Sequence, residues 1–385
     1  MKNLLYIFLC CSSVAVAQNA MYNNGSIRIH DTGTLGLHTN LINNAPFQDN
    51  LGTLGFYGQV TTSVTGAFIP VFYDVEMYKP FSAAILETSI TATNALNLVD
   101  GDFVTYRNNP LENLKLTQNA FTVGESNLSK VDGYMLVEQK QNFFFTVGDS
   151  GYIRPLTLQS QSENVTAKCA YFFEDPNLPS TFTTSFNTNN KEKEVRAVST
   201  TEFWDVDSSL PSTVSISWNN RSNIANLVDE YYQVGIAGWH RTQKRWVNLG
   251  SVDPIGDLNQ GAVTSETFVP NDYEVITLAK MAVATELLDL DNYYVSPNGD
   301  GINDNLVIPE LEESPNNRLR IYDRNGLKVF EKDNYNGEFN GYSNTNNTIY
   351  QRNAGLPSGI YFYLVFLDDL QLEYQGFLYL TDTSN

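Results

Sequence analysis

The sequence is poor in the residues on which most active sites and cross-links depend. Its 385 residues include three cysteines and three histidines. Cys10 and Cys11 lie in the apolar N-terminal run, which leaves Cys169 alone in the rest of the chain. A single cysteine cannot form an internal disulfide, so we expect the hydrophobic core to stabilise the chain. The apolar setting "AKCAYFF" predicts that Cys169 is a small buried thiol and not a nucleophile.

Basic residues are also scarce. The chain has 23 Lys and Arg residues against 43 Asp and Glu residues, a formal net charge of −20 at pH 7. This charge argues against a nucleic-acid partner, whose phosphates would be repelled, and against adsorption to bare anionic lipid. It is typical of a surface that keeps an exported protein soluble, and the alternative is an acidic surface that binds calcium.

Long apolar runs are absent after the N-terminus. Lys2 provides a basic start, "LLYIFLCCSSVAV" is too short to span a bilayer stably, and "AVAQ" gives a small-residue cleavage pattern that ends at Ala17. Residues 1–17 therefore predict a secretory signal peptide. Leu9 precedes Cys10, where a lipoprotein signal would have a small residue, so we expect no lipid anchor. The sequence predicts a soluble exported protein.

No sustained helical period interrupts the chain. Short runs rich in Val, Ile, Thr, Tyr and Phe are separated by Gly, Asn, Asp and Pro clusters, which is typical of an all-β protein. We expect tandem antiparallel β-sandwich (Ig-like) domains ending in a small β-sandwich. The expected segments are an N-terminal β domain at 18–165, an Ig-like β-sandwich at 166–284, a linker at 285–292 and a C-terminal domain at 293–385.

One short echo occurs within the first of these segments. "FTVGES" at residues 121–126 returns as "FTVGDS" at residues 145–150. A strand that ends in a glycine turn explains both copies, so we interpret them as two similar strand ends and not as a repeat architecture.

Candidate catalytic groups are few. No histidine lies in a metal-binding spacing such as H-E-x-x-H, and no G-x-S-x-G motif occurs. Two carboxylates at positions i and i+2 of a strand point to one face and could serve a glycosidase, but paired carboxylates are common in an acidic protein. The sequence therefore predicts no catalytic residue and no enzyme. The histidines are His30, His38 and His240, and the carboxylate pairs are Asp74 with Glu76, Asp205 with Asp207, and Asp368 with Asp369.

Three tryptophans lie at or near expected strand ends. Trp218, Trp239 and Trp246 are interpreted as core anchors, and the alternative is an exposed platform that binds a ligand.

The last hundred residues carry more specific patterns. "YYVSPNGDGINDNLVIP" begins at Tyr293, and "RLRIYDRNGLKVF" follows it. The alternation predicts strands at 318–323 and 327–332, and Asn325-Gly326 between them predicts a type I′ hairpin. Leu319 and Ile321 are expected to face Leu327 and Val329. "LPSGIYFY" and "LQLEYQGFLYL" predict a turn, an aromatic strand and a closing strand, which together make a small antiparallel sandwich.

These residues resemble the gliding-motility-associated C-terminal domain, the type B sorting signal of the type IX secretion system in Bacteroidota. The order of "SPNGDGIND", "LRIYDRNGLKVF", "LPSGIYFY" and a final strand with a glycine is that of the family. Asn325 stands where the family usually has Trp, and Phe339-Asn340-Gly341 replaces its usual Trp-Asp-Gly. The matching residues are Ser296, Pro297, Asn298, Gly299, Asp300, Gly301, Asn303, Asp304, Tyr322, Gly326, Pro357, Ser358 and Gly359.

The resemblance implies export through the inner membrane by the signal peptide and through the outer membrane by the type IX translocon. It implies a location at the cell surface or in the medium, and an association with a PorP/SprF-type outer-membrane protein or another subunit of a surface complex. We therefore expect an adhesin or a structural subunit of a gliding or adhesion complex. The alternative is a secreted carbohydrate-binding or carbohydrate-cleaving protein.

The polar turn itself leaves two interpretations open. "SPNGDGIND" fits the calcium-loop spacing D-x-N-x-D-G-x-x-D, with Ser296 in place of the first Asp. Asn298, Asp300 and Asp304 could supply oxygens to calcium, and Gly301 would permit the sharp turn. Alternatively, the same side chains bind backbone amides in a network of Asx-turns.

Overall fold

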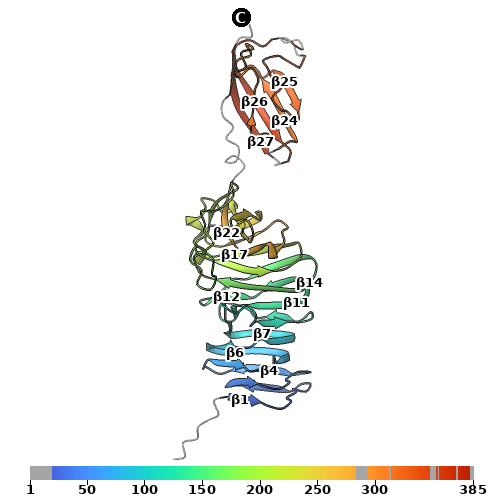
Figure 1. Cartoon of the computed structure of the whole chain (residues 1–385), viewed down its shortest axis with the longest axis vertical. Coiled ribbons are helices and arrows are strands. Elements are labelled where there is room, and N and C mark those ends of the chain that lie inside the picture. Colours follow the sequence, from blue (N-terminus) through green and yellow to red (C-terminus); the bar gives the residue numbers. More distant parts are fainter. Residues whose placement is uncertain are drawn as a thin grey trace, which may run out of the picture. The chain divides into compact units, whose positions relative to one another are not determined.

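The computed structural model of the chain (Figure 1) describes residues 20–282, 293–309, 311, 314–346, 353, 355–369 and 372–381. Strands make up 52% of the chain and helical turns 4%, which confirms the all-β expectation. Two compact units are present: the N-terminal unit ends at Met281, and the C-terminal unit begins at Ala282. The predicted signal peptide and the expected linker at 285–292 lie outside the described residues.

The first half of the N-terminal unit is a β-solenoid of stacked coils. Its strands pair in parallel, β1 with β3, β3 with β5, β2 with β4, β4 with β6, and β6 with β7, and Figure 1 shows β1, β4, β6 and β7 stacked in that order. The strands are β1 (Ala20–Asn23), β2 (Thr34–Leu37), β3 (Asn40–Asn43), β4 (Thr53–Tyr57), β5 (Thr62–Thr65), β6 (Val71–Leu86), β7 (Ile90–Thr105), β8 (Leu114–Leu116), β9 (Phe121–Val123) and β10 (Val131–Asp132).

The coils stack because apolar residues meet in register. Leu37 pairs with Phe56, Phe56 with Met77, and Met77 with Leu98, and all four side chains are buried. These residues are spaced by 19, 21 and 21 positions along the chain. Each coil alone has too little apolar area to form a core, and stacking places each inward side chain between two others.

This pairing corrects two expectations. The strands of residues 20–132 are parallel and not antiparallel, and a repeat architecture is present that the sequence does not reveal. A strand with one buried face alternates apolar and polar residues in either arrangement, so alternation cannot distinguish them. The echo at 121–126 and 145–150 is not the repeat, because Phe121 is exposed in β9 whereas Phe145 is buried in β11.

A ladder of buried asparagines joins the first coils. Asn23 Nδ2 donates to Asn43 Oδ1 at 2.7 Å, and Asn43 Nδ2 donates to the carbonyl oxygen of Phe68 at 2.8 Å. Both asparagine side chains are buried. Stacked side-chain amides therefore satisfy polar groups at a corner where the backbone leaves the sheet.

The rest of the N-terminal unit is mainly antiparallel. The first part of β14 pairs with β17 and its last part with β16, so the sheet divides into two branches. Its strands are β11 (Met135–Phe145), β12 (Val147–Asp149), β13 (Tyr152–Ile153), β14 (Leu156–Phe172), β15 (Val195–Val198), β16 (Phe203–Asp207), β17 (Ser212–Trp218), β18 (Val234–His240), β19 (Trp246–Asn248), β20 (Val252–Gly256), β21 (Gly261–Thr264) and β22 (Tyr273–Met281). Its short helical turns are η1 (Asn220–Ser222), η2 (Ile224–Asn226), η3 (Tyr231–Gln233) and η4 (Pro270–Asp272).

The boundary expected between residues 165 and 166 falls inside β14. The polar stretch that suggested it is an exposed bend of this strand, where Gln161, Ser162 and Glu163 face solvent. One cluster of buried apolar residues extends from Leu37 in the coils to Leu278 in β22. The coils and the antiparallel strands therefore share a hydrophobic core.

The C-terminal unit contains one five-stranded sheet among its described residues. The strand order is β23-β27-β26-β24-β25, with β23 parallel to β27 and the other pairs antiparallel. One face is covered by connecting segments that contribute Leu306, Tyr335, Phe339 and Leu356 to the core. The described part is thus a sheet covered by loops and not the expected sandwich. The strands are β23 (Tyr293–Val295), β24 (Asn317–Tyr322), β25 (Lys328–Asp333), β26 (Gly359–Leu367) and β27 (Leu372–Leu380).

The hairpin between β24 and β25 differs in detail from the prediction. Only Gly326 of the Asn325-Gly326 pair has a positive φ, 78°, whereas a type I′ turn needs two such residues. The Asp323 carboxylate accepts the amides of Asn325 and Leu327, both at 2.9 Å, and so closes a longer turn. A register shift follows, and Ile321 lies opposite Phe330 instead of Leu327 or Val329.

Candidate functional site

The strand ends that carry the predicted sorting motifs lie at one end of the C-terminal sheet. Val295, which precedes the polar turn, is in register with Leu380, and Leu380 with Gly359. Tyr322 at the end of β24 is in register with Phe362, near the start of β26. The structure therefore brings together three motifs that are far apart in the sequence.

Asp304 organises the polar turn. Its Oδ1 accepts the amide of Gly299 at 2.7 Å, and its Oδ2 accepts the amide of Gly301 at 2.8 Å. Both glycines have a positive φ, 81° and 83°, which few other residues adopt without strain. The backbone is closed further by the amide of Ser296, which donates to the carbonyl oxygen of Asn303 at 2.7 Å.

Asn298 and Asp300 complete the same network. Asn298 Oδ1 accepts the amide of Asp300 at 3.0 Å, and Asp300 Oδ1 accepts the amide of Ile302 at 2.8 Å. Asn298 Nδ2 donates to Asp300 Oδ2 at 3.0 Å. The described residues contain no group of three or more His, Cys, Asp or Glu side chains arranged to hold a metal. These hydrogen bonds are those of the Asx-turn interpretation, in which the side chains of the turn bind its backbone amides.

The other motif residues surround a second feature at this end of the sheet. Pro357, Ser358 and Gly359 line a cavity of about 430 Å³ together with the turn that begins at Asp323. Tyr361 Oη donates to the carbonyl oxygen of Pro357 at 2.8 Å and fixes the approach to β26. Asn325, which replaces the family's Trp, lines the same cavity.

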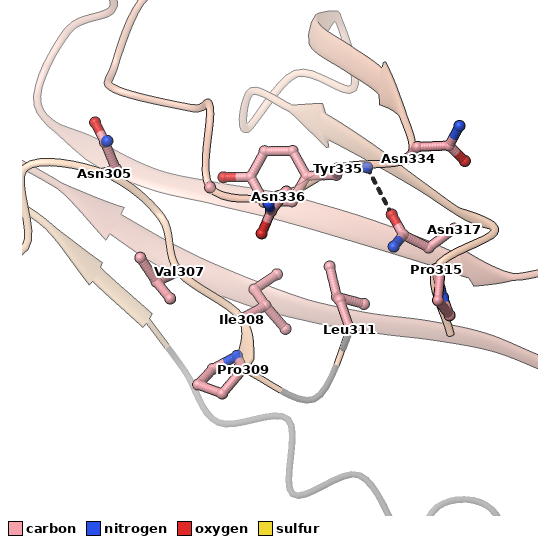
Figure 2. A pocket seen from close by; sticks show the side chains of 11 residues that line it. Asn305, Val307, Ile308, Pro309, Leu311, Pro315, Asn317, Asn334, Tyr335 and Asn336 are labelled. Carbon is pink, nitrogen blue, oxygen red and sulfur yellow. Dashed lines mark hydrogen bonds between the residues drawn. The ribbon is translucent and has the colours of Figure 1, made fainter. Parts of the chain in front are cut away.

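A larger groove of about 690 Å³ follows the polar turn (Figure 2). Val307, Ile308 and Pro309 line one side, and Asn336 lies across from them, while Asn334 lines the groove further along. The groove combines an apolar surface with amides that can donate and accept hydrogen bonds, which suits an extended polypeptide or a small polar ligand.

The wall of this groove is held by Tyr335. Its backbone amide donates to Asn317 Oδ1 at 2.8 Å, as Figure 2 shows. Its buried hydroxyl donates to the carbonyl oxygen of Leu306 and accepts the amide of Phe339. Burial raises the pKa of the Tyr335 phenol, so the hydroxyl stays protonated and keeps donating.

The uncovered face of the C-terminal sheet is aromatic, which the sequence analysis missed. Tyr294 is in register with Tyr379, and their rings stack at 6.0 Å. Phe362 is in register with Phe377, and all four side chains are about half exposed. The signal was present in "IYFYLVF" and "YQGFLYL", where both alternating faces are apolar although only one can face the core. We call these four residues and Ile360 the aromatic face.

The first carboxylate pair lies on the outward surface of the coils. Asp74 Oδ1 accepts Asn94 Nδ2 at 2.7 Å, and Glu76 accepts Asn97 Nδ2 at 2.9 Å. Tyr57 Oη also donates to Glu76, at 2.8 Å. Burial and this hydrogen bond raise the pKa of Tyr57 to about 12, so the phenol donates at neutral pH.

The second pair is divided between the interior and the surface. Asp205 is buried and accepts the hydroxyl of Tyr134 at 2.6 Å, whereas Asp207 is half-buried and pairs with Lys168 at 3.0 Å. Burial and the charge of Asp207 raise the pKa of Asp205 to about 6. In the third pair, Asp369 accepts hydrogen bonds from Asn316: its Oδ1 lies 2.6 Å from Asn316 Nδ2, and its Oδ2 accepts the backbone amide.

The remaining candidate residues have structural surroundings. Cys169 is buried, as expected, and its burial raises the pKa of the thiol. Trp218, Trp239 and Trp246 are buried and therefore anchor the core, as expected, and do not form an exposed platform. His38 packs against Tyr57 with ring centroids 5.7 Å apart. No helix among the described residues is long and apolar enough to cross a membrane.

Comparison with known proteins identifies the C-terminal unit. Residues 288–380 match the family model described as the CHU_C type IX secretion signal domain. No curated protein and no solved structure matches the chain. The match covers the polar turn, the hairpin and the aromatic strands, so the resemblance drawn from those motifs is confirmed. The C-terminal unit of this chain is a type IX secretion signal domain, and it directs the protein to the cell surface or the extracellular space.

Proposed function

We propose that the protein is a non-enzymatic subunit of a surface adhesion or gliding complex, delivered by its type IX secretion signal. This proposal rests on one observation: the same chain contains a type IX secretion signal domain and a β-solenoid. Stacked coils present extended surfaces, which repeat proteins use for binding. Asp74 and Glu76, the paired carboxylates of the coils, accept hydrogen bonds from Asn94 and Asn97 and are consistent with this role.

The C-terminal unit would contact the secretion machinery, with a PorP/SprF-type outer-membrane protein as the proposed partner. The aromatic face supports this proposal, because contiguous exposed apolar surface marks interaction sites. Aromatic residues such as Tyr and Phe are also enriched in the buried cores of protein interfaces. Arg320 lies at the margin of this face, with its guanidinium 4.9 Å from the centre of the Phe366 ring, and adds a polar rim.

The adhesive role can be tested in the native host. A strain whose gene encodes only the signal peptide joined to residues 283–385 lacks the whole described N-terminal unit. We expect this strain to display the C-terminal unit normally but to lose attachment to solid surfaces or gliding. Cell-surface immunostaining measures display, and counting attached and moving cells measures function.

Restoring the complete chain in the same strain is the control and should restore the phenotype. Unchanged attachment and gliding without residues 20–282 would contradict the adhesive role, whereas failed display would contradict the sorting role of residues 283–385.

A further inference from the structure

The ring of Tyr57 lies flat on the outward surface of the coils. A Cβ atom at Gly55 would lie 2.1 Å from this ring, and one at Gly36 would lie 3.0 Å from it. Gly36 and Gly55 are in register on β2 and β4. The two glycines therefore leave a bare strip of backbone on which the ring rests, and Tyr57 remains partly exposed.

Neighbouring side chains hold the Tyr57 ring in this orientation. Glu76 accepts its hydroxyl at 2.8 Å, and the His38 ring packs against it. The buried Lys79 side chain donates to the carbonyl oxygen of Tyr57 at 3.1 Å and fixes the end of β4. A ring held at its edge, its hydroxyl and its backbone loses little freedom when a ligand binds.

Two more aromatic side chains extend this surface. Tyr78 on β6 is in register with Tyr57 and is 50% exposed. Adjacent strands lie about 4.8 Å apart, so His38, Tyr57 and Tyr78 form a strip about 10 Å long, which we call the tyrosine strip. Phe81 follows it at the corner of the coil, fully exposed and with a φ of 61°.

The conformation of Phe81 is costly for a bulky side chain. It arises because four residues of β6 lie between Tyr78 and Ala83, whereas their partners Asp100 and Asp102 on β7 are separated by Gly101 alone. The extra residues project from the coil. An exposed and strained aromatic residue beside other exposed rings indicates that the surface is built for contact.

Polar groups flank the tyrosine strip on its strands. Asp74, Glu76 and Tyr78 occupy every second position of β6 and therefore share its outward face. Asn94 and Asn97 on β7 donate hydrogen bonds to the two carboxylates. These side chains are partly exposed. Carboxylates and carboxamides can bond to hydroxyl groups, and charge-assisted hydrogen bonds are the stronger ones.

We propose that this outward face of the coils binds a neutral glycan, with the tyrosine strip as the platform on which sugar rings stack. A sugar ring has an apolar face of C–H groups that packs on an aromatic ring, and hydroxyl groups at its edge that bond to carboxylates and amides. Asp74 and Glu76, with the net charge of −20, repel uronate and sulfate groups, so the ligand is neutral. The inference names a ligand class for the adhesive role proposed above and rests on it.

The test uses the purified exported chain, residues 18–385, on an array of neutral oligosaccharides (β-glucans, xylans, mannans and chitin oligomers) beside uronate and sulfated glycans. We expect binding to neutral glycans. Tyr57→Phe keeps the ring but removes the hydrogen bond to Glu76, and Tyr78→Ala removes an exposed ring that the core does not need. By calorimetry, Tyr78→Ala should weaken binding about tenfold, and Tyr57→Phe should weaken it less.

Tyr232→Ala is the matched control, because Tyr232 is similarly exposed, at 56%, but lies on η3. It should leave affinity unchanged, and the melting temperature of each variant reports its folding. Binding to none of the glycans, binding only to acidic glycans, or neutral-glycan binding that Tyr78→Ala leaves intact would each overturn the inference. Loss of attachment in the strain lacking residues 20–282 would still uphold the adhesive role in those cases.

Discussion

At the scale of single residues, Asp205 links the stability of the N-terminal unit to pH. Its folded pKa is raised to about 6 by burial and by the charge of Asp207, against about 3.9 for an unfolded aspartic acid. The folded chain therefore holds this proton more tightly than the unfolded chain. The resulting stabilisation is fully present below about pH 4 and is lost as pH rises through about 6.

Asp205→Asn should remove this dependence. The amide oxygen can still accept the hydroxyl of Tyr134, and no charge remains to be buried. We expect the variant to melt several degrees above the wild type at about pH 8 and to match it near pH 4. Thermal melting across this range is the measurement, with Asp253→Asn as an exposed control. A variant less stable than the wild type at about pH 8 would refute this account.

At the scale of elements, the asparagine ladder holds the first coils together. Asn43→Ala deprives Asn23 of an acceptor and the carbonyl oxygen of Phe68 of a donor, both in the coil corner. The cost should be about 1–3 kcal/mol. Hydrogen exchange should become faster in β1–β5 but not in β16–β22. The exposed Asn24→Ala is the control, and unchanged protection of β1–β5 would show that the ladder is dispensable.

The polar turn gives a second prediction at this scale. Because Asp304 already accepts the amides of Gly299 and Gly301, we expect millimolar calcium to leave the melting temperature of the C-terminal unit unchanged. Asp304→Ala should lower the free energy of unfolding of this unit, and with it the melting temperature, because two hydrogen bonds to a charged group are lost, each worth at most about 1–3 kcal/mol. If calcium instead raises the melting temperature and Asp304→Ala abolishes this rise, the turn is a calcium loop.

The elements also show how far the sequence determines the fold. Strand positions follow from local alternation, and the motifs of the C-terminal unit follow from distinctive turn residues such as Gly301 and Gly326. The parallel pairing does not, because Leu37, Phe56 and Met77 share a column only through contacts about twenty residues apart. The tyrosine strip could not be predicted for the same reason, because the Tyr57 ring packs against Gly36, which lies in another coil.

At the scale of the whole molecule, the two units have separate hydrophobic cores among the described residues and, in our proposal, separate roles. Among the described residues, the core of the C-terminal unit comes from Tyr293 onward, and the N-terminal unit ends at Met281. Export and surface activity can therefore be separated genetically. The sequence predicted the export role from chemically distinctive motifs, whereas the β-solenoid emerged only from the three-dimensional arrangement.

The most direct measurement is the location of a chain that lacks residues 293–385, expressed in the native host and followed by cell fractionation and by protease treatment of intact cells. The C-terminal unit is the type IX secretion signal domain, so the truncated chain should accumulate in the periplasm, protected from protease, while the complete chain is cleaved at the cell surface. Normal surface display of the truncated chain would contradict the account.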